Sequence, residues 1–297
     1  MMAAMKTQLR GELSTHESLA NYTTWRVGGL AKQLYRPANL DDLQEFLAGL
    51  PSNEPLLWIG LGSNLLIRDG GFNGTVIAMY GVNADVHIDD CDVTVGAGVA
   101  CAKVARQCAR EGLSGGAFLA GIPGTMGGAL AMNAGAFGGE TWQVVNQACM
   151  INRLGELNWR ERDEFDIDYR HVKRFDDEWF VAARLTLQKG DAAEEQQAIR
   201  DLLDKRAATQ PTGKPSGGST FRNPEGDYAA RLIEQCGLKG YQIGGASVSE
   251  KHANFIINED GCSAADIEQL IIFIGNEVER QTGIRLQPEV HVVGDAL

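Results

Sequence analysis

The spacing of apolar residues along the chain predicts a mixture of amphipathic helices and short strands. The clearest helix covers residues 264–282, where apolar side chains recur at helical spacing and Ser263 with Asp266 forms a capping box. Its apolar stripe consists of Ile267, Leu270, Ile271, Ile274 and Val278. Further helices are predicted at 41–50, 101–111, 190–206 and 227–236, and strands at 56–59, 75–79, 92–95, 147–151, 179–187 and 290–293.

The length of the chain indicates two or three domains. The chain has 297 residues, of which 44% are hydrophobic and 22% are charged, as is usual for globular proteins. Composition changes near residue 190, where a charged helical segment begins, and a loop rich in Pro and Gly follows at 210–218. We therefore expect a domain boundary near 190–200.

The net charge and the spacing of the cysteines limit the classes of binding partner and metal site that the sequence supports. A formal net charge of -12 disfavours nucleic acids and acidic membranes, but it allows a phosphorylated small ligand that is held by local N–H groups. The six cysteines form no CxxC pair, so neither zinc ligation nor a disulfide scaffold is supported, and Cys101 and Cys108 are expected to be buried hydrophobes. Residues 1–12 do not resemble a signal peptide, and no apolar run is long enough to span a membrane. We expect a cytoplasmic protein.

Glycine is the compositional exception, with 36 residues, about 12% against a typical 7% or so. Two clusters stand out, Gly60-Leu-Gly-Ser-Asn64 after a predicted strand and Gly121-Ile-Pro-Gly-Thr-Met-Gly-Gly-Ala129, which is followed by Asn133-Ala-Gly-Ala136. Glycines let the backbone approach a ligand, and successive N–H groups can bind an anion. An ordinary loop or tight helix packing would also explain each cluster, but two clusters together favour a dinucleotide.

Other nucleotide motifs are weak or missing. Gly96-x-Gly98 follows a strand and precedes a helix, but Cys101 stands at the third motif position and no acidic residue ends a strand at the required distance. Lys214 is followed by Pro215, so the sequence has no P-loop. We therefore interpret Gly96 and Gly98 as a strand-to-helix turn.

Three segments carry candidate chemistry. Ser219 follows two glycines in Ser216-Gly-Gly-Ser-Thr-Phe-Arg-Asn-Pro224, which exposes its hydroxyl without the Gly-x-Ser-x-Gly elbow of a hydrolase. On its own, Arg170 beside Tyr169 favours a surface ion pair with a nearby acid over a site, and Glu289 near the C-terminus would usually be solvated. On chemistry alone, only the Ser219 loop points to a binding or catalytic turn.

Taken together, the motifs resemble those of the UDP-N-acetylenolpyruvoylglucosamine reductase family from about Asn21 to Gly294. The matching segments begin with Asn21-Tyr-Thr-Thr-Trp-Arg-Val-Gly-Gly29 and the two glycine clusters, and continue with Tyr169-Arg170, Gly218-Ser-Thr-Phe-Arg-Asn-Pro224, Gly244-Gly-Ala-Ser-Val-Ser-Glu-Lys-His-Ala-Asn-Phe255 and Pro288-Glu289. The chain is similar to the compact subgroup that lacks a substrate-capping insertion.

The resemblance implies an α+β fold: a two-lobed FAD-binding domain of the vanillyl-alcohol-oxidase (PCMH) type and a C-terminal α/β substrate-binding domain. We expect the lobes at 1–85 and 86–195 and the substrate domain at 196–297. It also implies non-covalent FAD that is reduced by NADPH and passes hydride to the enolpyruvyl group of a UDP-sugar. The product would be UDP-N-acetylmuramate, for peptidoglycan synthesis, and we expect a monomer.

The resemblance also assigns roles to residues. Arg170 would stabilise an enolate, Ser219 would deliver a proton to C2, and Glu289 would act beside the same group, protonated or sharing a proton. Tyr169, Arg170 and Asn223 would contact substrate. The expected FAD-binding residues are Tyr22, Thr23, Gly60, Leu61, Gly62, Ser63, Asn64, Leu65, Gly121, Ile122, Pro123, Gly124, Thr125, Gly128 and Ala129.

The chain departs from the family pattern after Tyr169-Arg170, where His171 and Val172 replace the usual Asp or Asn and then Ser.

Two other classes of protein remain open at this stage. One is an oxidase that attaches its flavin covalently, although the five histidines lie outside the glycine turns. The other is a non-catalytic nucleotide-binding protein, which would not need an exposed hydroxyl at Ser219.

Overall fold

The computed structural model describes residues 9–173 and 175–297, so the prediction about a signal peptide lies largely outside the described part. In chain order the elements are β1 Glu12–Ser18, η1 Leu19–Tyr22, β2 Leu30–Arg36, α1 Leu40–Ala48, β3 Leu56–Ile59, β4 Leu65–Ile67, β5 Phe72–Ala78, β6 Val86–Asp89, β7 Asp92–Gly96, α2 Cys101–Arg110, β8 Leu113–Ser114, η2 Ala117–Gly121, α3 Met126–Ala131, β9 Gly135–Ala136, β10 Gly139–Glu140, η3 Thr141–Gln143, β11 Val145–Asn152, β12 Leu157–Glu161, η4 Arg162–Glu164, β13 Asp166–Asp168, β14 His171–Lys173, β15 Glu178–Thr186, β16 Gln188–Lys189, α4 Ala192–Thr209, α5 Ala229–Gln235, β17 Gln242–Ile243, β18 Ala246–Val248, β19 Ile256–Asn258, α6 Ala264–Thr282 and β20 His291–Val293.

The described chain divides into two compact units. Unit 1 comprises residues 9–15, 33–60 and 74–196, and unit 2 comprises residues 16–32, 61–73 and 197–297. The first division falls inside β1 and the Gly60–Asn64 cluster is split after Gly60, so each unit is built from segments that are distant in sequence.

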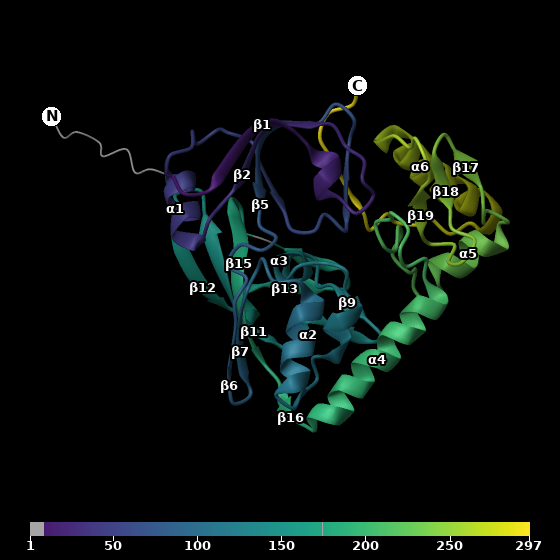
Figure 1. Cartoon of the computed structure of the whole chain (residues 1–297). Coiled ribbons are helices and arrows are strands. Elements are labelled where there is room, and N and C mark those ends of the chain that lie inside the picture. Colours follow the sequence, from purple (N-terminus) through teal and green to yellow (C-terminus); the bar gives the residue numbers. More distant parts are fainter. Residues whose placement is uncertain (1–8, 174) are drawn as a thin grey trace. The chain divides into compact units, whose positions relative to one another are not determined.

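Unit 1 contains most residues of two sheets. One has the order β1-β2-β5-β3, and the other is a five-stranded sheet with the order β12-β11-β15-β7-β6 (Figure 1). Helix α1 covers the first sheet with buried Leu43, Phe46 and Leu47, and these pack with Ile77 and Val181. Cys101 and Cys108 lie buried on one face of α2, as predicted, and burial raises the pKa of their thiols to about 12 and about 11.

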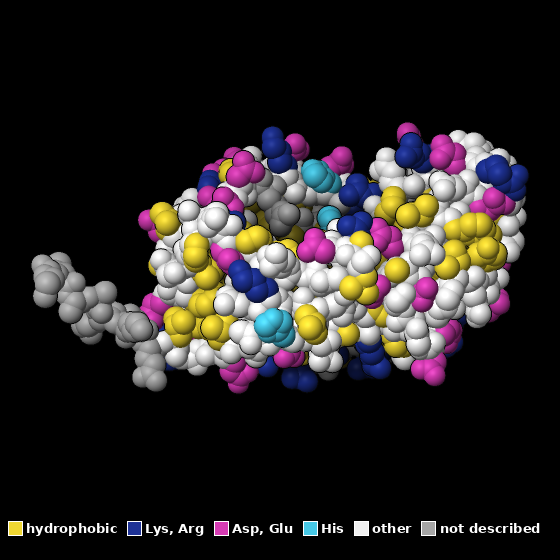
Figure 2. Space-filling model, turned by 90° about the horizontal axis from the view of Figure 1, so that it is seen from above, with side chains coloured by type: hydrophobic (Ala, Val, Ile, Leu, Met, Phe, Trp, Pro, Cys, Tyr) yellow, Lys and Arg dark blue, Asp and Glu magenta, His cyan; other side chains and the backbone are white. Residues whose placement is uncertain are grey.

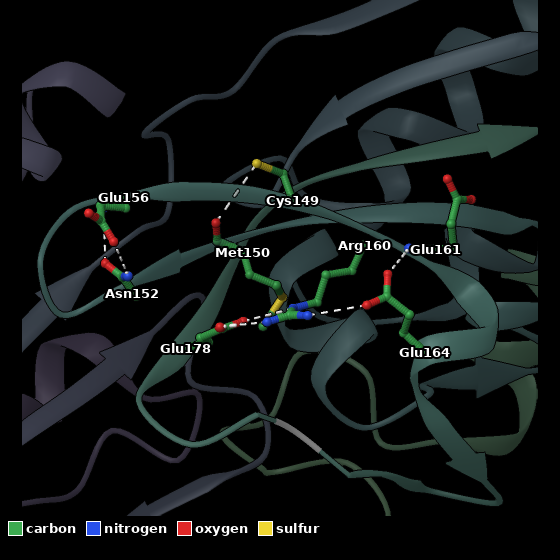
Figure 3. Close-up of polar contacts among 8 residues, drawn as sticks. All are labelled: Cys149, Met150, Asn152, Glu156, Arg160, Glu161, Glu164 and Glu178. Atoms are coloured by element: carbon green, nitrogen blue, oxygen red, sulfur yellow. Dashed lines mark hydrogen bonds and ion pairs between the residues drawn. The ribbon is translucent and has the colours of Figure 1, made fainter.

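The edge strand β12 is fixed by a polar network that Figure 3 shows. Arg160 donates two hydrogen bonds to the Glu178 carboxylate, at 3.0 and 2.7 Å, and one to Glu164 at 3.2 Å. The guanidinium also lies over the Phe175 ring, 3.7 Å from its centroid. This network holds the segment that leads into the β13–β14 hairpin, which carries Tyr169 and Arg170.

Unit 2 is organised around α6. Its predicted capping box is confirmed, because Ser263 Oγ accepts from Asp266 N and the Asp266 carboxylate accepts from Ser263 N. The five predicted stripe residues are all buried, and they pack with the buried rings of Trp25 and Phe221. Helix α6 lies beside α5 and the sheet β17-β18-β19 (Figure 1). Strand β20 pairs in parallel with β4, and so brings the C-terminal segment beside residues 65–67.

Acidic and basic side chains are interspersed on the face of the molecule that Figure 2 shows. None of the described helices is long and apolar enough to cross a membrane.

Candidate active site

The two predicted glycine clusters meet within unit 1. A Cβ at Gly60 would collide with the Thr125 hydroxyl, so Gly60 permits the strand β3 to end directly against the second cluster. The second cluster is held in place by backbone pairing, since Cys101 N donates to Gly124 O at 2.9 Å and Met126 N donates to Val99 O at 2.8 Å. Thr125 then caps α3 by accepting from Gly128 N.

Gly96 and Gly98 are required by this packing. A Cβ at either position would collide with the backbone carbonyl of Asn83 or Val82. The adjacent Ala97 carbonyl accepts from Gly127 N at 2.9 Å, so this turn is hydrogen-bonded to the second cluster. The interpretation of Gly96 and Gly98 as a strand-to-helix turn agrees with these contacts.

The remainder of the first cluster lies in unit 2 beside the predicted cofactor residues Tyr22 and Thr23. Gly62 has φ +60°, which favours glycine, and a Cβ there would collide with the Tyr22 carbonyl. Thr23 is buried and its hydroxyl donates to Val27 O at 3.0 Å, which fixes the turn that faces Gly62. Sequence positions 22–24 and 61–64 therefore form one surface.

Arg170 occupies a strained hairpin turn in unit 1. Strands β13 and β14 pair Asp168 with His171, which leaves Tyr169 and Arg170 as the loop, and Arg170 has φ +54°. A non-glycine residue in this region typically costs about 1 kcal/mol or more. Arg170 therefore occupies a turn position that glycine, asparagine or aspartate would adopt with less strain.

The Arg170 guanidinium is directed onto the loop before β9. Its Nη1 donates to Asn133 O at 3.2 Å and its Nη2 donates to Gly135 O at 3.0 Å, while Glu140 Oε1 lies 3.9 Å from Nη1. Arg170 thus approaches the acidic side chain of Glu140, as the ion-pair interpretation expects. Two backbone carbonyls also fix the orientation of its guanidinium.

Ser219 and Glu289 are brought together within unit 2. Gly217 is buried against Trp25, where any side chain would collide with the indole ring, and Gly218 has φ +75°. The residues that follow Ser219 pair with the segment before β20, because Glu289 N donates to Thr220 O at 2.8 Å and Arg222 N donates to Gln287 O at 2.9 Å. Ser219 and Glu289 are both half-buried.

The first glycine cluster also reaches Glu289. Asn64 Nδ2 donates to the Glu289 carbonyl at 3.0 Å, and His291 N donates to the Asn64 carbonyl at 3.0 Å. The other substrate candidate, Asn223, is exposed at the end of the Ser219 loop, and its Oδ1 accepts from Ala229 N at 3.1 Å at the start of α5. Unit 2 thus gathers Ser219, Asn223, Glu289 and Asn64, whereas Arg170 belongs to unit 1.

Two family models match the chain. The model described as "UDP-N-acetylenolpyruvoylglucosamine reductase, C-terminal domain" matches residues 210–293, and the model described as "FAD binding domain" matches residues 31–159. A UDP-N-acetylenolpyruvoylglucosamine reductase of Legionella pneumophila (strain Corby) is 58% identical over 293 residues, which are 98% of this chain and 95% of that protein. The chain belongs to the UDP-N-acetylenolpyruvoylglucosamine reductase family.

Further relatives agree over the whole length. The family member from Alkalilimnicola ehrlichii is 55% identical over 296 residues, which cover 100% of this chain and 99% of that protein. The crystal structure of the Thermus caldophilus family member superposes with a TM-score of 0.80 at 31% identity, and covers 95% of this chain and 98% of that chain. The expected fold class, an FAD-binding domain with a C-terminal domain of this reductase family, is confirmed.

The two glycine clusters fit FAD, the cofactor that the resemblance to the family implies. Gly60 allows main chain to lie directly on Thr125 in unit 1, and Gly62 allows it to lie directly on Tyr22 in unit 2. Gly128 is exposed, and the nearest atom to a Cβ there would be the Thr125 hydroxyl oxygen at 3.8 Å, so a ligand has room beside the start of α3. Backbone next to open space is the environment that a dinucleotide phosphate or ring requires.

Sequence reasoning did not identify two buried asparagines that organise the site. Asn133 Nδ2 donates to Asp168 O at 3.2 Å and to Glu140 Oε2 at 3.0 Å, and thereby ties the Arg170 hairpin to the neighbouring loop. Asn254 contacts the Ser219 loop in unit 2. Both asparagines lie in the motifs named above, but Asp168, which Asn133 contacts, and Phe221, which Asn254 contacts, are more than 30 residues away from them, so local spacing gave no signal.

Proposed function

We propose that this protein reduces UDP-N-acetylglucosamine enolpyruvate to UDP-N-acetylmuramate, with FAD bound non-covalently and NADPH as the hydride donor. The reaction would serve peptidoglycan precursor synthesis. Membership in the reductase family supports the reaction, and the hydrogen-bonded approach of the Ser219 loop to Glu289 is the structural observation that carries it. Reduction of an enolpyruvyl double bond needs a proton donor as well as a hydride, and this pair supplies candidate donor groups.

Residues 22–23 and 61–65 of unit 2 would contact FAD, and so would residues 60, 121–125 and 128–129 of unit 1. When bound, FAD would relay hydride from NADPH to C3 of the enolpyruvyl group. The chain's own residues handle the charge and the proton. Hydride addition leaves negative charge on C2 and the conjugated carboxylate. Arg170 would stabilise this charge, because its guanidinium is permanently cationic and is oriented in advance by Asn133 and Gly135.

Ser219 would complete the reduction by giving its hydroxyl proton to C2. A serine hydroxyl is a weak acid, so this role needs close placement and a neighbouring acid that limits charge on the oxygen. Glu289 would meet that need, because its backbone is fixed to Thr220 beside Ser219. Asn223 and Tyr169 would contact the UDP-sugar from the ends of their loops.

A spectroscopic titration tests the proposal. The purified protein should be yellow, should lose its flavin absorbance when NADPH is added without oxygen, and should regain it when the enolpyruvyl UDP-sugar is added. UDP-N-acetylglucosamine, which lacks the enolpyruvyl group, is the matched control and should leave the flavin reduced. Failure of the enolpyruvyl UDP-sugar to reoxidise the flavin would contradict the function, and flavin that stays attached after denaturation would contradict non-covalent binding.

We also infer that the enzyme is a cytoplasmic monomer with lobes at 1–85 and 86–195 and a substrate domain at 196–297. The match of the reductase C-terminal model to residues 210–293 supports the last boundary. Light scattering during gel filtration should give the mass of one chain of 32.1 kDa. A mass of two chains would contradict the monomer.

A further inference from the structure

Asn254 lies in a turn that is stabilised by hydrogen bonds among residues 249–255. Ser249 N donates to Phe255 O at 2.9 Å, and the Ser249 hydroxyl accepts from the backbone N–H groups of Lys251 and His252 at 3.2 and 3.3 Å. These bonds close the turn and leave Asn254 with only 3% of its surface exposed. A buried carboxamide needs partners for both its donor and its acceptor.

The partners of Asn254 are the two residues that follow Ser219. Its Oδ1 accepts from Phe221 N at 2.9 Å, and its Nδ2 donates to Phe221 O at 2.8 Å. Its own carbonyl accepts from Thr220 N at 2.8 Å. The carboxamide therefore acts like a neighbouring peptide group, and matches the N–H and the C=O of one residue at once.

The same two residues also hold the segment that carries Glu289. Phe221 forms an antiparallel bridge with Pro288, and the flanking hydrogen bonds run from Glu289 N to Thr220 O and from Arg222 N to Gln287 O. Residues 220–222 are thus bound to Asn254 on the one hand and to residues 287–289 on the other. Thr220 and Phe221 are fully buried, so water cannot replace the bonds to Asn254.

We propose that Asn254 is a positioning residue that sets the placement of Ser219 relative to Glu289 for proton delivery. This inference rests on the function proposed above. Directly before Ser219, Gly218 has φ +75° and open space around its Cβ position, so this residue gives the serine no packing support. The bonds from Asn254 to Thr220 and Phe221 supply that support immediately after Ser219.

Two substitutions separate positioning from general stability. Asn254→Asp keeps the shape of the side chain, but an ionised carboxylate cannot donate to the Phe221 carbonyl, whereas a protonated one can. Burial raises the pKa of an introduced carboxyl, so the variant should regain function as the pH falls. Asn254→Ala removes both side-chain bonds at every pH. Ser247→Ala is the control, because Ser247 is also buried in unit 2 and its hydroxyl donates to Glu259 at 3.1 Å, away from residues 219–222.

The measurements are flavin reduction by NADPH and flavin reoxidation by saturating enolpyruvyl UDP-sugar, from pH 5 to pH 9. Asn254→Ala should bind FAD and be reduced by NADPH at near the wild-type rate, but its reoxidation should slow about 100-fold, since a shift on the order of 1 Å has this effect. For Asn254→Asp, the ratio of its reoxidation rate to that of wild type should rise about tenfold per pH unit on acidification above the carboxyl pKa. Ser247→Ala should match wild type in both steps.

A pH-independent ratio for Asn254→Asp would overturn the positioning role, as would equal slowing of both steps in either variant. If Asn254→Ala does not fold, the pH dependence of Asn254→Asp decides alone, because the protonated form retains both bonds. Wild-type enzyme whose flavin is reduced by NADPH but not reoxidised by the UDP-sugar would instead contradict the proposed function, so the two failures are distinguishable.

Discussion

The backbone N–H of Glu289 donates to the carbonyl of Thr220 at 2.8 Å, so the glutamate and the neighbouring Ser219 are held on paired segments that lie about 70 residues apart in sequence. Hydrogen bonding between main-chain groups persists when either side chain is changed. Substitution at Ser219 or Glu289 should therefore alter the chemistry without releasing the pairing. This separation makes the site suitable for half-reaction analysis.

Ser219→Ala should retain FAD and near wild-type flavin reduction by NADPH, but reoxidation by the enolpyruvyl UDP-sugar should fall about 10²- to 10⁴-fold. The reason is that the proton to C2 is needed only in the second step. Stopped-flow absorbance measures both steps. Ser114→Ala in unit 1 is the matched serine control and should behave as wild type. Reoxidation of Ser219→Ala at the wild-type rate would remove the serine from the mechanism.

Glu289→Gln should give the same pattern, with an intact first step and a second step slowed about 100-fold or more, because an amide cannot share a proton as a carboxylic acid does. The backbone bonds of residue 289 to Thr220 and Asn64 are unchanged by this substitution. Glu279→Gln on the exposed face of α6 is the control. Slow reduction by NADPH in Glu289→Gln would be incompatible with a role confined to the second step.

Arg170→Lys should reduce the rate of the second step at saturating substrate although the charge is kept. A lysine cannot donate to Asn133 O and Gly135 O in the planar fork that the guanidinium uses, so its charge is not oriented. We expect a loss of about tenfold or more, measured by reoxidation of the reduced enzyme. Arg184→Lys, on the exposed side of β15, provides the comparison. Equal activity of Arg170→Lys and wild type would show that orientation does not matter.

Much of the secondary structure was predictable because it depends on local pattern. The bounds of α6 and β3 match the predicted ranges, and the other predicted helices and strands lie within about three residues of those observed. Among the strands that were missed are β1 and β6. Glu12–Ser18 is largely exposed and has no regular apolar alternation, whereas Val86–Asp89 alternates apolar and polar residues but is only four residues long.

The site was only partly predictable from the sequence, for a physical reason. The glycine clusters and the Ser219 loop could be predicted because the residue types that form a turn are adjacent in sequence. The residues that orient the site side chains come from distant segments. Asn254 lies 33 residues from Phe221, and Asn133 lies 35 residues from Asp168. The strain at Arg170 is likewise set by the register of β13 and β14, which residue types alone do not specify.

Asp42 is a fully buried acidic residue of unit 1 whose carboxylate accepts several hydrogen bonds. It lies in the first turn of α1 with none of its surface exposed, and its carboxylate accepts from Tyr35 Oη at 2.6 Å, Ala38 N at 2.9 Å and Arg10 N at 2.7 Å. Burial raises the pKa of this carboxyl, but the hydrogen bonds from Tyr35, Ala38 and Arg10 outweigh burial, so its pKa is below the ordinary 3.8. The ionised form is therefore the one that the fold stabilises.

Asp42→Asn should lower the free energy of unfolding by about 2–3 kcal/mol near neutral pH, because hydrogen bonds to a charge are lost and an amide donor faces N–H donors. A depressed folded-state pKa contributes stability above the unfolded value of 3.8 and loses it as the pH falls through the folded value. Acidification below about pH 4 should therefore destabilise wild type more than the variant. The difference in free energy of unfolding between the two proteins should narrow. Urea unfolding at pH 7 and pH 3 measures this gap, and Asp41→Asn, exposed in the same helical turn, is the control. A gap that is independent of pH would show that the Asp42 charge does not stabilise the fold.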